Sequence, residues 1–380
     1  MKKCPSEKKT YRDPESGIEV TQWTNYCGHS HHLYFTNPGW YDDGRKLLFA
    51  SDRNNIKNLF GINLVTGELE QITDFSEEKP GIRPSFHLAS LNPKRDEAYL
   101  IHERRLKAID LKTGKESVLN EVGSGWNFMM TNCSADGKYV YYGTSEYPSG
   151  GFEVDLANGY VGSEQIWSSK PQSRIHRTPV NGEKTETIFE EKYWIGHVNT
   201  SPTQPHLLTY CHEGPWAKVD NRIWGLDAST GRNWKIRPRK SDENPGHEYW
   251  YADGLRIGFH GEYKNRKNFI GGIEFDNSNH FEAAFPGWTG HIFSLDENLI
   301  IGDGNGVIRV WKWNGEKYLA PRLLCRHDSS MKFQESHPHP RISPDGKYVI
   351  FSSDRRGGYV NVYTVPIVDF ESLPEIKGET

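Results

Sequence analysis

The chain has 380 residues, a formal net charge of −4 and 13% aromatic residues, with 37 glycines and 21 prolines. The sequence contains no long basic run and no stretch of about 20 apolar residues, which argues against nucleic acid as a partner and against a membrane-spanning helix. The five cysteines are scattered without CxxC spacing, so neither a disulfide framework nor a thiolate zinc site is expected. Because the N-terminus lacks an apolar signal segment, we expect a cytoplasmic protein, or a periplasmic one if a leader has been removed.

The first predicted strand lies near the N-terminus, in "SGIEVTQWT" (16–24). It matches "TGELEQIT" (66–73), which ends the first complete repeat, but no strands of its own precede it. We therefore expect residues 16–24 to complete the last repeat unit by pairing with strands at the C-terminus.

The first complete repeat runs from Tyr41 to Thr73 and contains a DG turn, strands at 46–50 and 59–64, and the "ELEQIT" segment. Residues 343–367, "SPDGKYVIFSSDRRGGYVNVYTVPI", repeat its first part without the final strand. Alternating apolar residues bounded by Asp and Gly turns are typical of antiparallel strands. The sequence therefore predicts an all-β protein built from repeated antiparallel sheets.

Turns of the same type recur along the chain at seven places, at 43–44, 94–96, 136–137, 202–204, 253–254, 296–298 and 345–346. Their spacing is typical of four-stranded blades with insertions, which predicts one seven-bladed β-propeller domain over residues 1–380. The longest interval contains a polar, glycine-rich segment at about 146–170, which we expect to be an inserted loop.

Histidines recur at matching distances before these turns. His197, His247 and His339 each lie six residues before a turn residue, and His291 lies five before Asp296. The first strand of each propeller blade runs into this turn, so the four histidines are predicted near the same end of four inner strands. For His197 or His247 alone, an ordinary packed histidine is the default interpretation.

The segment "FQESHPHP" (333–340) predicts part of a metal site. Because side chains alternate along the expected inner strand, His337 and His339 point the same way, and Gln334 is near enough to add an oxygen. His291 from the preceding blade is the expected third imidazole. Three nitrogens and one oxygen suit Mn²⁺, Fe²⁺, Ni²⁺ or Zn²⁺ better than Ca²⁺. A packed or surface histidine pair is the alternative.

Other polar segments are open to two interpretations. Arg222 could bind a carboxylate with two hydrogen bonds or form a salt bridge with Asp220 or Glu213. His31 and His32 could contact a substrate or cap a loop. A nucleophilic role for Cys211 beside His212 is disfavoured, because adjacent strand residues point to opposite faces. The sequence carries no G-x-S-x-G elbow, P-loop or dinucleotide fingerprint.

Four segments, with the opening "YRDPESGIEVTQWT", resemble the oligogalacturonate lyases, a polysaccharide lyase family of seven-bladed propellers: "CHEGPWAKVDNRIW", "GHEYWYADG", "GHIFSLDENLIIGDG" and "QESHPHPRISPDGKYVIFSSDRRG". The resemblance covers nearly the whole chain. It implies β-elimination on acidic oligosaccharides from pectin, giving a 4,5-unsaturated uronate. It also implies Mn²⁺, or another divalent transition metal, held by the residues Gln334, His291, His337 and His339.

The resemblance further implies His247 as general base and Arg222 as a substrate-binding and charge-stabilising residue. His31, His197 and His212 are the expected substrate contacts. Two alternatives stay open: a lyase acting on another uronate oligosaccharide, of rhamnogalacturonan or algal type, and a non-catalytic propeller that binds a protein or peptide. No nucleic acid or membrane partner is expected, and the sequence sets no oligomeric state.

Overall fold

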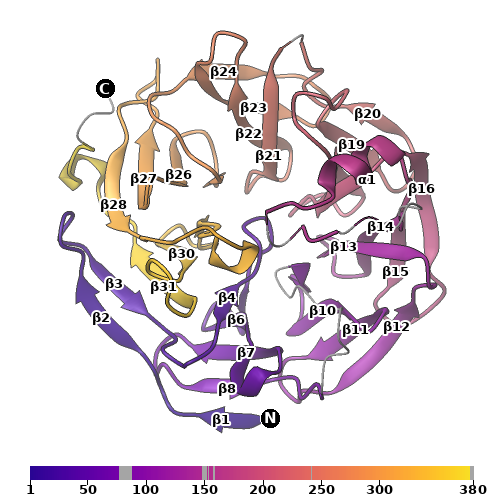
Figure 1. Ribbon diagram of the computed structural model, residues 1–380, viewed down its shortest axis with the longest axis horizontal. Helices are drawn as coiled ribbons and strands as arrows, with labels where there is room; N and C mark the ends of the chain where they lie inside the picture. The colour runs from indigo at the N-terminus through magenta and orange to yellow at the C-terminus, as the bar shows by residue number, and fades with distance from the viewer. Residues whose placement is uncertain (77–87, 148–151, 153, 157–158, 241, 377–380) are drawn as a thin grey trace. The chain divides into compact units, whose positions relative to one another are not determined.

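The computed structural model describes residues 1–76, 88–147, 152, 154–156, 159–240 and 242–376. In these residues the strands form seven separate antiparallel sheets, and the one α-helix is the short α1 (Ser163–Ser169) (Figure 1). The chain is thus an all-β, seven-bladed β-propeller, as its sequence predicts. By backbone contacts it divides into two compact units, Met1–His87 with Ala283–Thr380, and Leu88–Glu282. A single domain over residues 1–380 stays a prediction.

The first unit contains three sheets. In sheet order, the first consists of β1 (Lys2–Cys4), β8 (Leu69–Gln71), β7 (Asn58–Asn63), β6 (Lys46–Ser51) and β4 (Ser30–His32), with β5 (Trp40–Tyr41) also on β6. The second consists of β25 (Ile292–Ser294), β26 (Leu299–Gly304), β27 (Val307–Lys312) and β28 (Arg322–Arg326). The third consists of β2 (Lys9–Arg12), β3 (Glu19–Gln22), β31 (Asn361–Pro366), β30 (Tyr348–Ser353) and β29 (Arg341–Ile342).

The third sheet confirms the predicted pairing between the two ends of the chain. β3 runs antiparallel to β31, with Thr21 opposite Thr364 and Gln22 opposite Tyr363, and Figure 1 shows the indigo N-terminal strand beside the yellow C-terminal one. Two strands were not expected from the sequence: β2 extends this sheet outward, and β1 extends the first sheet. Both are mostly exposed and short, so they lack the apolar pattern by which the other strands were found.

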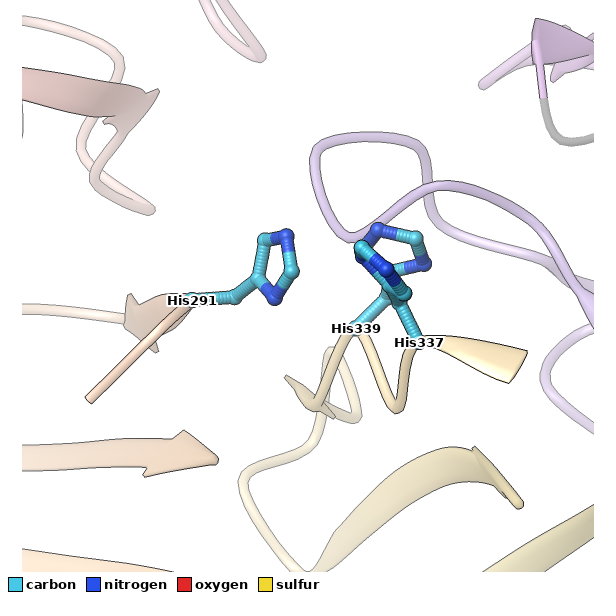
Figure 2. Close-up of side chains that lie close together, drawn as sticks. All are labelled: His291, His337 and His339. Atoms are coloured by element: carbon cyan, nitrogen blue, oxygen red, sulfur yellow. The ribbon is translucent and has the colours of Figure 1, made fainter. Parts of the chain in front are cut away.

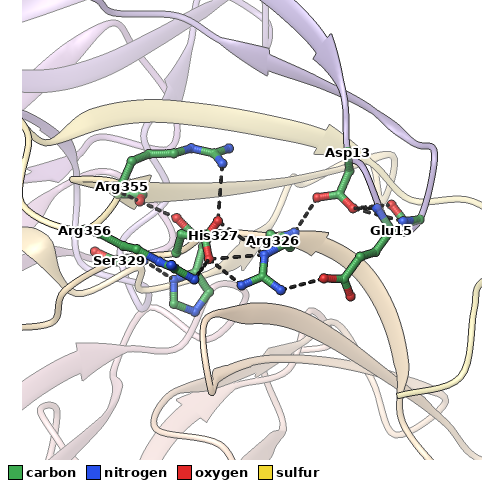
Figure 3. A network of polar contacts seen from close by, with 10 residues as sticks. Asp13, Glu15, Arg326, His327, Ser329, Arg355 and Arg356 are labelled. Atoms are coloured by element: carbon green, nitrogen blue, oxygen red, sulfur yellow. Dashed lines mark hydrogen bonds and ion pairs between the residues drawn. The ribbon is translucent and has the colours of Figure 1, made fainter. Parts of the chain in front are cut away.

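A polar network anchors the β2–β3 turn to the end of β28 (Figure 3). The buried carboxylate of Asp13 accepts the backbone N–H of Arg326 at 2.7 Å. The Arg326 guanidinium donates to Glu15 and to Asp328, each at 2.6 Å. These charge-assisted hydrogen bonds reinforce the closure that β3 and β31 make through their backbones.

The second unit contains four sheets. The first two are β9 (Ser90–Leu91), β10 (Glu97–His102), β11 (Arg105–Asp110) and β12 (Glu116–Glu121), then β13 (Trp126–Cys133), β14 (Tyr139–Glu146), β15 (Gln172–Pro179) and β16 (Glu186–Lys192). The other two are β17 (Ile195–Thr200), β18 (Leu207–His212), β19 (Ile223–Asp227) and β20 (Asn233–Lys235), then β21 (Asn244–Trp250), β22 (Arg256–Glu262), β23 (Asn268–Glu274) and β24 (Phe281–Ala284).

The expected inserted loop at 146–170 connects β14 to β15. Residues 148–151, 153, 157 and 158 of that loop lie outside the described residues. Its C-terminal part forms α1, where a loop alone was expected. No helix in the described ranges has the length and apolarity needed to cross a bilayer. A cytoplasmic location stays a prediction.

Neighbouring sheets pack through continuous apolar runs. All five residues of Leu47–Ser51 in β6 are buried, although only alternate residues share a face. Phe49 and Leu47 pack in one cluster with Ile350 of β30 and Val362 of β31, so residues of the first sheet meet those of the third. A strand covered on both faces buries consecutive residues. Alternation of apolar and polar residues is therefore a weak signal for the inner strands of this sequence.

Candidate metal centre

Three histidines of the first unit converge (Figure 2). Each of His291, His337 and His339 offers a ring nitrogen, and these atoms lie within 4.8 Å of one another. The ring centroids are 4.4 to 5.6 Å apart. Two nitrogens that share one ion at about 2.1 Å each lie roughly 3 to 4 Å apart. The three rings therefore need little movement to bind a common ion.

A turn of the chain brings His337 and His339 together. The prediction that these two residues lie in a strand is wrong. Residues 337–340 follow the 3₁₀ helix η3 (Gln334–Ser336) and precede β29, and they belong to no strand. His339 has a left-handed backbone, with φ of +46°. Strand alternation therefore does not explain why the two rings lie on the same side.

Hydrogen bonds to the residue between the two histidines hold this turn. The carbonyl of Pro338 accepts the backbone N–H of Ser352 at 3.0 Å and lies 3.0 Å from Nε2 of His32. A carbonyl can only accept, so Nε2 of His32 carries the proton. Burial lowers the pKa of His32 to about 4, which keeps its ring neutral. His32 is thus a support for the turn, in keeping with the loop-capping alternative considered for it.

The imidazole of His291, the residue before β25, is oriented by a buried carboxylate on the neighbouring strand β26. Asp303 lies 2.8 Å from Nδ1 of His291 and accepts its backbone N–H at 2.7 Å. Burial opposes ionisation of Asp303, but the charge and hydrogen bonds of His291 outweigh it and lower the pKa of the carboxyl. With Nδ1 against the carboxylate, His291 would bind an ion through Nε2.

The other two predicted ligands differ in what the structure shows. Burial and the neighbouring His291 lower the pKa of His337, so its ring is in the neutral form that binds metals. Gln334 is the first residue of η3, and its carbonyl accepts the backbone N–H of His337 at 3.1 Å. Its side chain as a fourth ligand stays a prediction.

The histidines six residues before their turns do occupy a repeated structural position. His197 in β17 and His247 in β21 have φ of +47° and +50°, close to the +46° of His339. In both strands the pairing register shifts at this point, between Gly196 and Asn199 and between Gly246 and Tyr249. A β-bulge of this kind re-aims the side chain it carries.

Arg222, just before β19, forms the salt bridge considered as its alternative role. Its guanidinium donates to Glu213 at 2.8 Å and 3.4 Å, and Glu213 also lies 3.1 Å from Nε2 of His197. Burial raises the pKa of Glu213, but Arg222 and His197 outweigh it, so the carboxyl stays ionised. Arg222 and His197 as substrate contacts stay predictions.

His247 is paired with a second histidine in its own sheet. Its Nδ1 lies 2.8 Å from Nε2 of His260, and the two rings are nearly parallel with centroids 5.1 Å apart. The edge of Trp216 packs against His247 at 5.0 Å. These contacts fix the plane of the imidazole ring. The role of general base stays a prediction.

Comparison with known proteins identifies the family. The sequence pattern of a family described as oligogalacturonate lyase matches residues 1–370. The chain belongs to the oligogalacturonate lyase family. It is therefore a lyase, which confirms the predicted resemblance and sets aside the non-catalytic alternative.

Individual relatives agree over nearly the full length. The chain is 25% identical to the oligogalacturonide lyase of Pectobacterium atrosepticum, over 93% of this chain and 95% of that protein. It is also 25% identical to the oligogalacturonate lyase of Dickeya dadantii, over 92% and 93%. A solved structure of an oligogalacturonate lyase in complex with manganese has a TM-score of 0.85 at 24% identity, covering 97% of this chain and 98% of that one. That structure shares the fold.

Two further predicted substrate contacts in this lyase lie in buried networks. His212 has Asp220 at 2.6 Å from Nδ1 and Glu191 at 2.8 Å from Nε2. Burial lowers its pKa, but the two carboxylates outweigh burial and raise it. His31 is buried, with its pKa lowered to about 4 by desolvation. That His212 and His31 contact the substrate stays a prediction.

Sequence reasoning missed two residues that support the candidate site, Asp303 and His260, and left His32 open between a substrate contact and a loop cap. A usable signal existed for Asp303, since an acid inside the apolar run "LIIGDG" must find a partner when its strand is buried. The partner of His260 lies on another strand and that of His32 in a loop, and spacing along the chain indicates neither.

Proposed function

We propose that this member of the family cleaves oligogalacturonates by β-elimination with the help of a divalent cation, most simply Mn²⁺. The cation would be held by His291, His337 and His339, with Gln334 as a fourth ligand. The observation that carries the proposal is the convergence of three imidazole nitrogens within 4.8 Å. The manganese named for the solved relative supports the choice of ion.

The residues present fit such an ion. Three imidazole nitrogens and an amide oxygen suit a borderline transition metal and leave coordination positions open. The Asp303–His291 pair is the carboxylate–histidine arrangement that orients metal ligands and raises their basicity. When bound, the cation would act as a Lewis acid on the uronate carboxylate.

In the proposed reaction His247 removes the proton from C5 of the uronate. The electron pair of the C5–H bond forms the C4=C5 double bond, the C4–O bond breaks, and the leaving oxygen takes up a proton. The contact of Nδ1 with His260 supports this role, because it fixes the orientation of the ring that would receive the proton.

Arg222 is the proposed cationic contact for developing carboxylate charge. Its bond to Glu213 and its position 5.7 Å from the ring of Trp216 hold the guanidinium plane fixed. Charge that is oriented in advance costs little reorganisation during the reaction. The proposed roles of Arg222 and His247 rest on contacts within the second unit. The proposed cation site rests on contacts within the first unit.

An absorbance assay tests the proposed function. The protein is incubated with Mn²⁺ or EDTA and with digalacturonate, trigalacturonate or another uronate oligosaccharide, while the ultraviolet band of the conjugated C4=C5 bond is followed. We expect a rise on the galacturonates that EDTA abolishes. A rise on another uronate alone would move the substrate to that class, and no rise on any of them would refute the proposal.

A further inference from the structure

One tryptophan of this chain stands apart in its exposure. All twelve tryptophans lie in the described part of the chain, and Trp288 alone among them is exposed, with 50% of its surface accessible. Tryptophan has the largest side chain and is usually well buried in folded proteins. An indole left open to water therefore needs an explanation if its position is fixed.

The loop that carries Trp288 is firmly held. On one side, the buried Trp311 donates from Nε1 to the carbonyl of Pro286 at 2.9 Å. On the other side, Thr289 donates to the carbonyls of His291 and Asp303 at 2.7 and 2.6 Å, and Gly290 N–H donates to Asp303 at 2.8 Å. The exposure of Trp288 is thus a property of an ordered loop.

This loop borders the candidate metal centre within the first unit. Trp288 precedes His291 by three residues. A Cβ added at Gly304 would lie 2.6 Å from the Trp288 carbonyl and 3.3 Å from its ring atom Cε3. Gly304 directly follows Asp303, the residue that orients His291. The indole therefore lies over the end of β26, the strand that carries Asp303, the carboxylate partner of His291.

We infer that Trp288 is a stacking platform for a sugar ring of the substrate, next to the uronate bound at the metal centre. A pyranose ring presents apolar C–H groups on its face, and a flat indole matches that face while leaving the hydroxyl and carboxylate groups in water. A single aromatic side chain is too small for a protein interface, which needs a contiguous patch. This inference rests on the proposed function.

The test compares Trp288→Ala and Trp288→Phe with wild type on di-, tri- and tetragalacturonate at saturating Mn²⁺. Tyr348→Ala is the matched control, because Tyr348 is 46% exposed, lies in the same unit, and follows the 345–346 turn, at the other end of its blade from His339. For Trp288→Ala we expect KM to rise about tenfold on the longer substrates, equivalent to about 1.4 kcal/mol, with kcat nearly unchanged. Trp288→Phe should show a smaller rise, and Tyr348→Ala none.

Two results would overturn the inference while the proposed function stands. One is wild-type KM for Trp288→Ala on every chain length. The other is a loss of kcat at unchanged KM, which would mean that the side chain acts on the chemistry or the fold. If the wild-type protein itself forms no unsaturated product, the proposed function is refuted, and the inference about Trp288 is refuted with it. Equal affinity for Mn²⁺ in all variants, measured by calorimetry, separates substrate stacking from damage to the metal centre.

Discussion

Two histidine sites in different units show how neighbours decide what an imidazole does. In the first unit, three imidazoles face one another, and the pKa of His337 is lowered by burial and by His291. In the second unit, His212 lies between Asp220 and Glu191, and its pKa is raised. Imidazole nitrogens gathered together suit a bound cation, whereas two carboxylates around one imidazole favour its protonated, cationic form. Two sequence segments that are similarly rich in polar residues thus form sites with opposite chemistry: one suits a metal cation, and the other favours a protonated imidazole.

The largest expected effect comes from removing a metal ligand. His337→Ala or His339→Ala should lose bound Mn²⁺ and lower kcat by about a hundredfold or more, because two imidazoles hold the ion far less tightly than three. Metal content by atomic absorption and the ultraviolet assay measure both. His280→Ala, which removes a partly exposed histidine bonded to Glu282, is the control. Full metal content in the ligand variants would refute the site.

The next effect concerns the proposed base. His247→Ala should lower kcat by about 10² to 10⁴ while leaving Mn²⁺ affinity unchanged, because a general base contributes to the chemical step and not to the ion. Calorimetric titration with Mn²⁺ alongside the elimination rate separates the two. Near-normal elimination by this variant would show that the base is another residue.

A smaller effect is expected at the residue behind the ligand. Asp303→Asn should weaken Mn²⁺ binding by about ten- to a hundredfold, since the amide no longer orients and polarises His291, while much of kcat returns at excess metal. Asp13→Asn is the matched control, another buried aspartate of the first unit that accepts a backbone N–H, from Arg326. Unchanged metal affinity in Asp303→Asn would contradict the positioning role.

The smallest effect is on the free energy of unfolding. Its dependence on pH has opposite signs for the two kinds of histidine. His212 has a raised pKa, so its contribution to the free energy of unfolding is full below its unfolded pKa of about 6.5 and is lost as pH rises through the folded value. His32, with a pKa near 4, contributes fully above 6.5 and loses this as pH falls toward 4.

Urea unfolding of His212→Gln and His32→Gln across pH measures these two contributions. The destabilisation by His212→Gln should be greater at pH 6 than at pH 8.5, and that by His32→Gln greater at pH 7.5 than at pH 5. The same pH trend in both variants would remove the contrast between the two sites.

The repeat, the seven sheets and the pairing of residues 16–24 with the C-terminal strands could all be predicted from the sequence alone. These depend on local signals: Asp-Gly turns, short apolar strands, and a strand pattern missing at one end and present at the other. The sequence also selected His291, His337 and His339, through the resemblance and the HxH spacing. It misjudged how His337 and His339 come together, because φ of +46° at His339 depends on contacts to Pro338 from other strands.

The partner of each charged side chain became clear from the folded chain and not from the sequence. Arg222 had Asp220 and Glu213 as possible partners, and the fold places Glu213 against it. Asp303 reaches His291 across twelve residues because β25 and β26 pair side by side. The physical reason is that burial makes an unmatched charge costly, so the partner is chosen by what lies nearby in space, and spacing along the chain does not specify that.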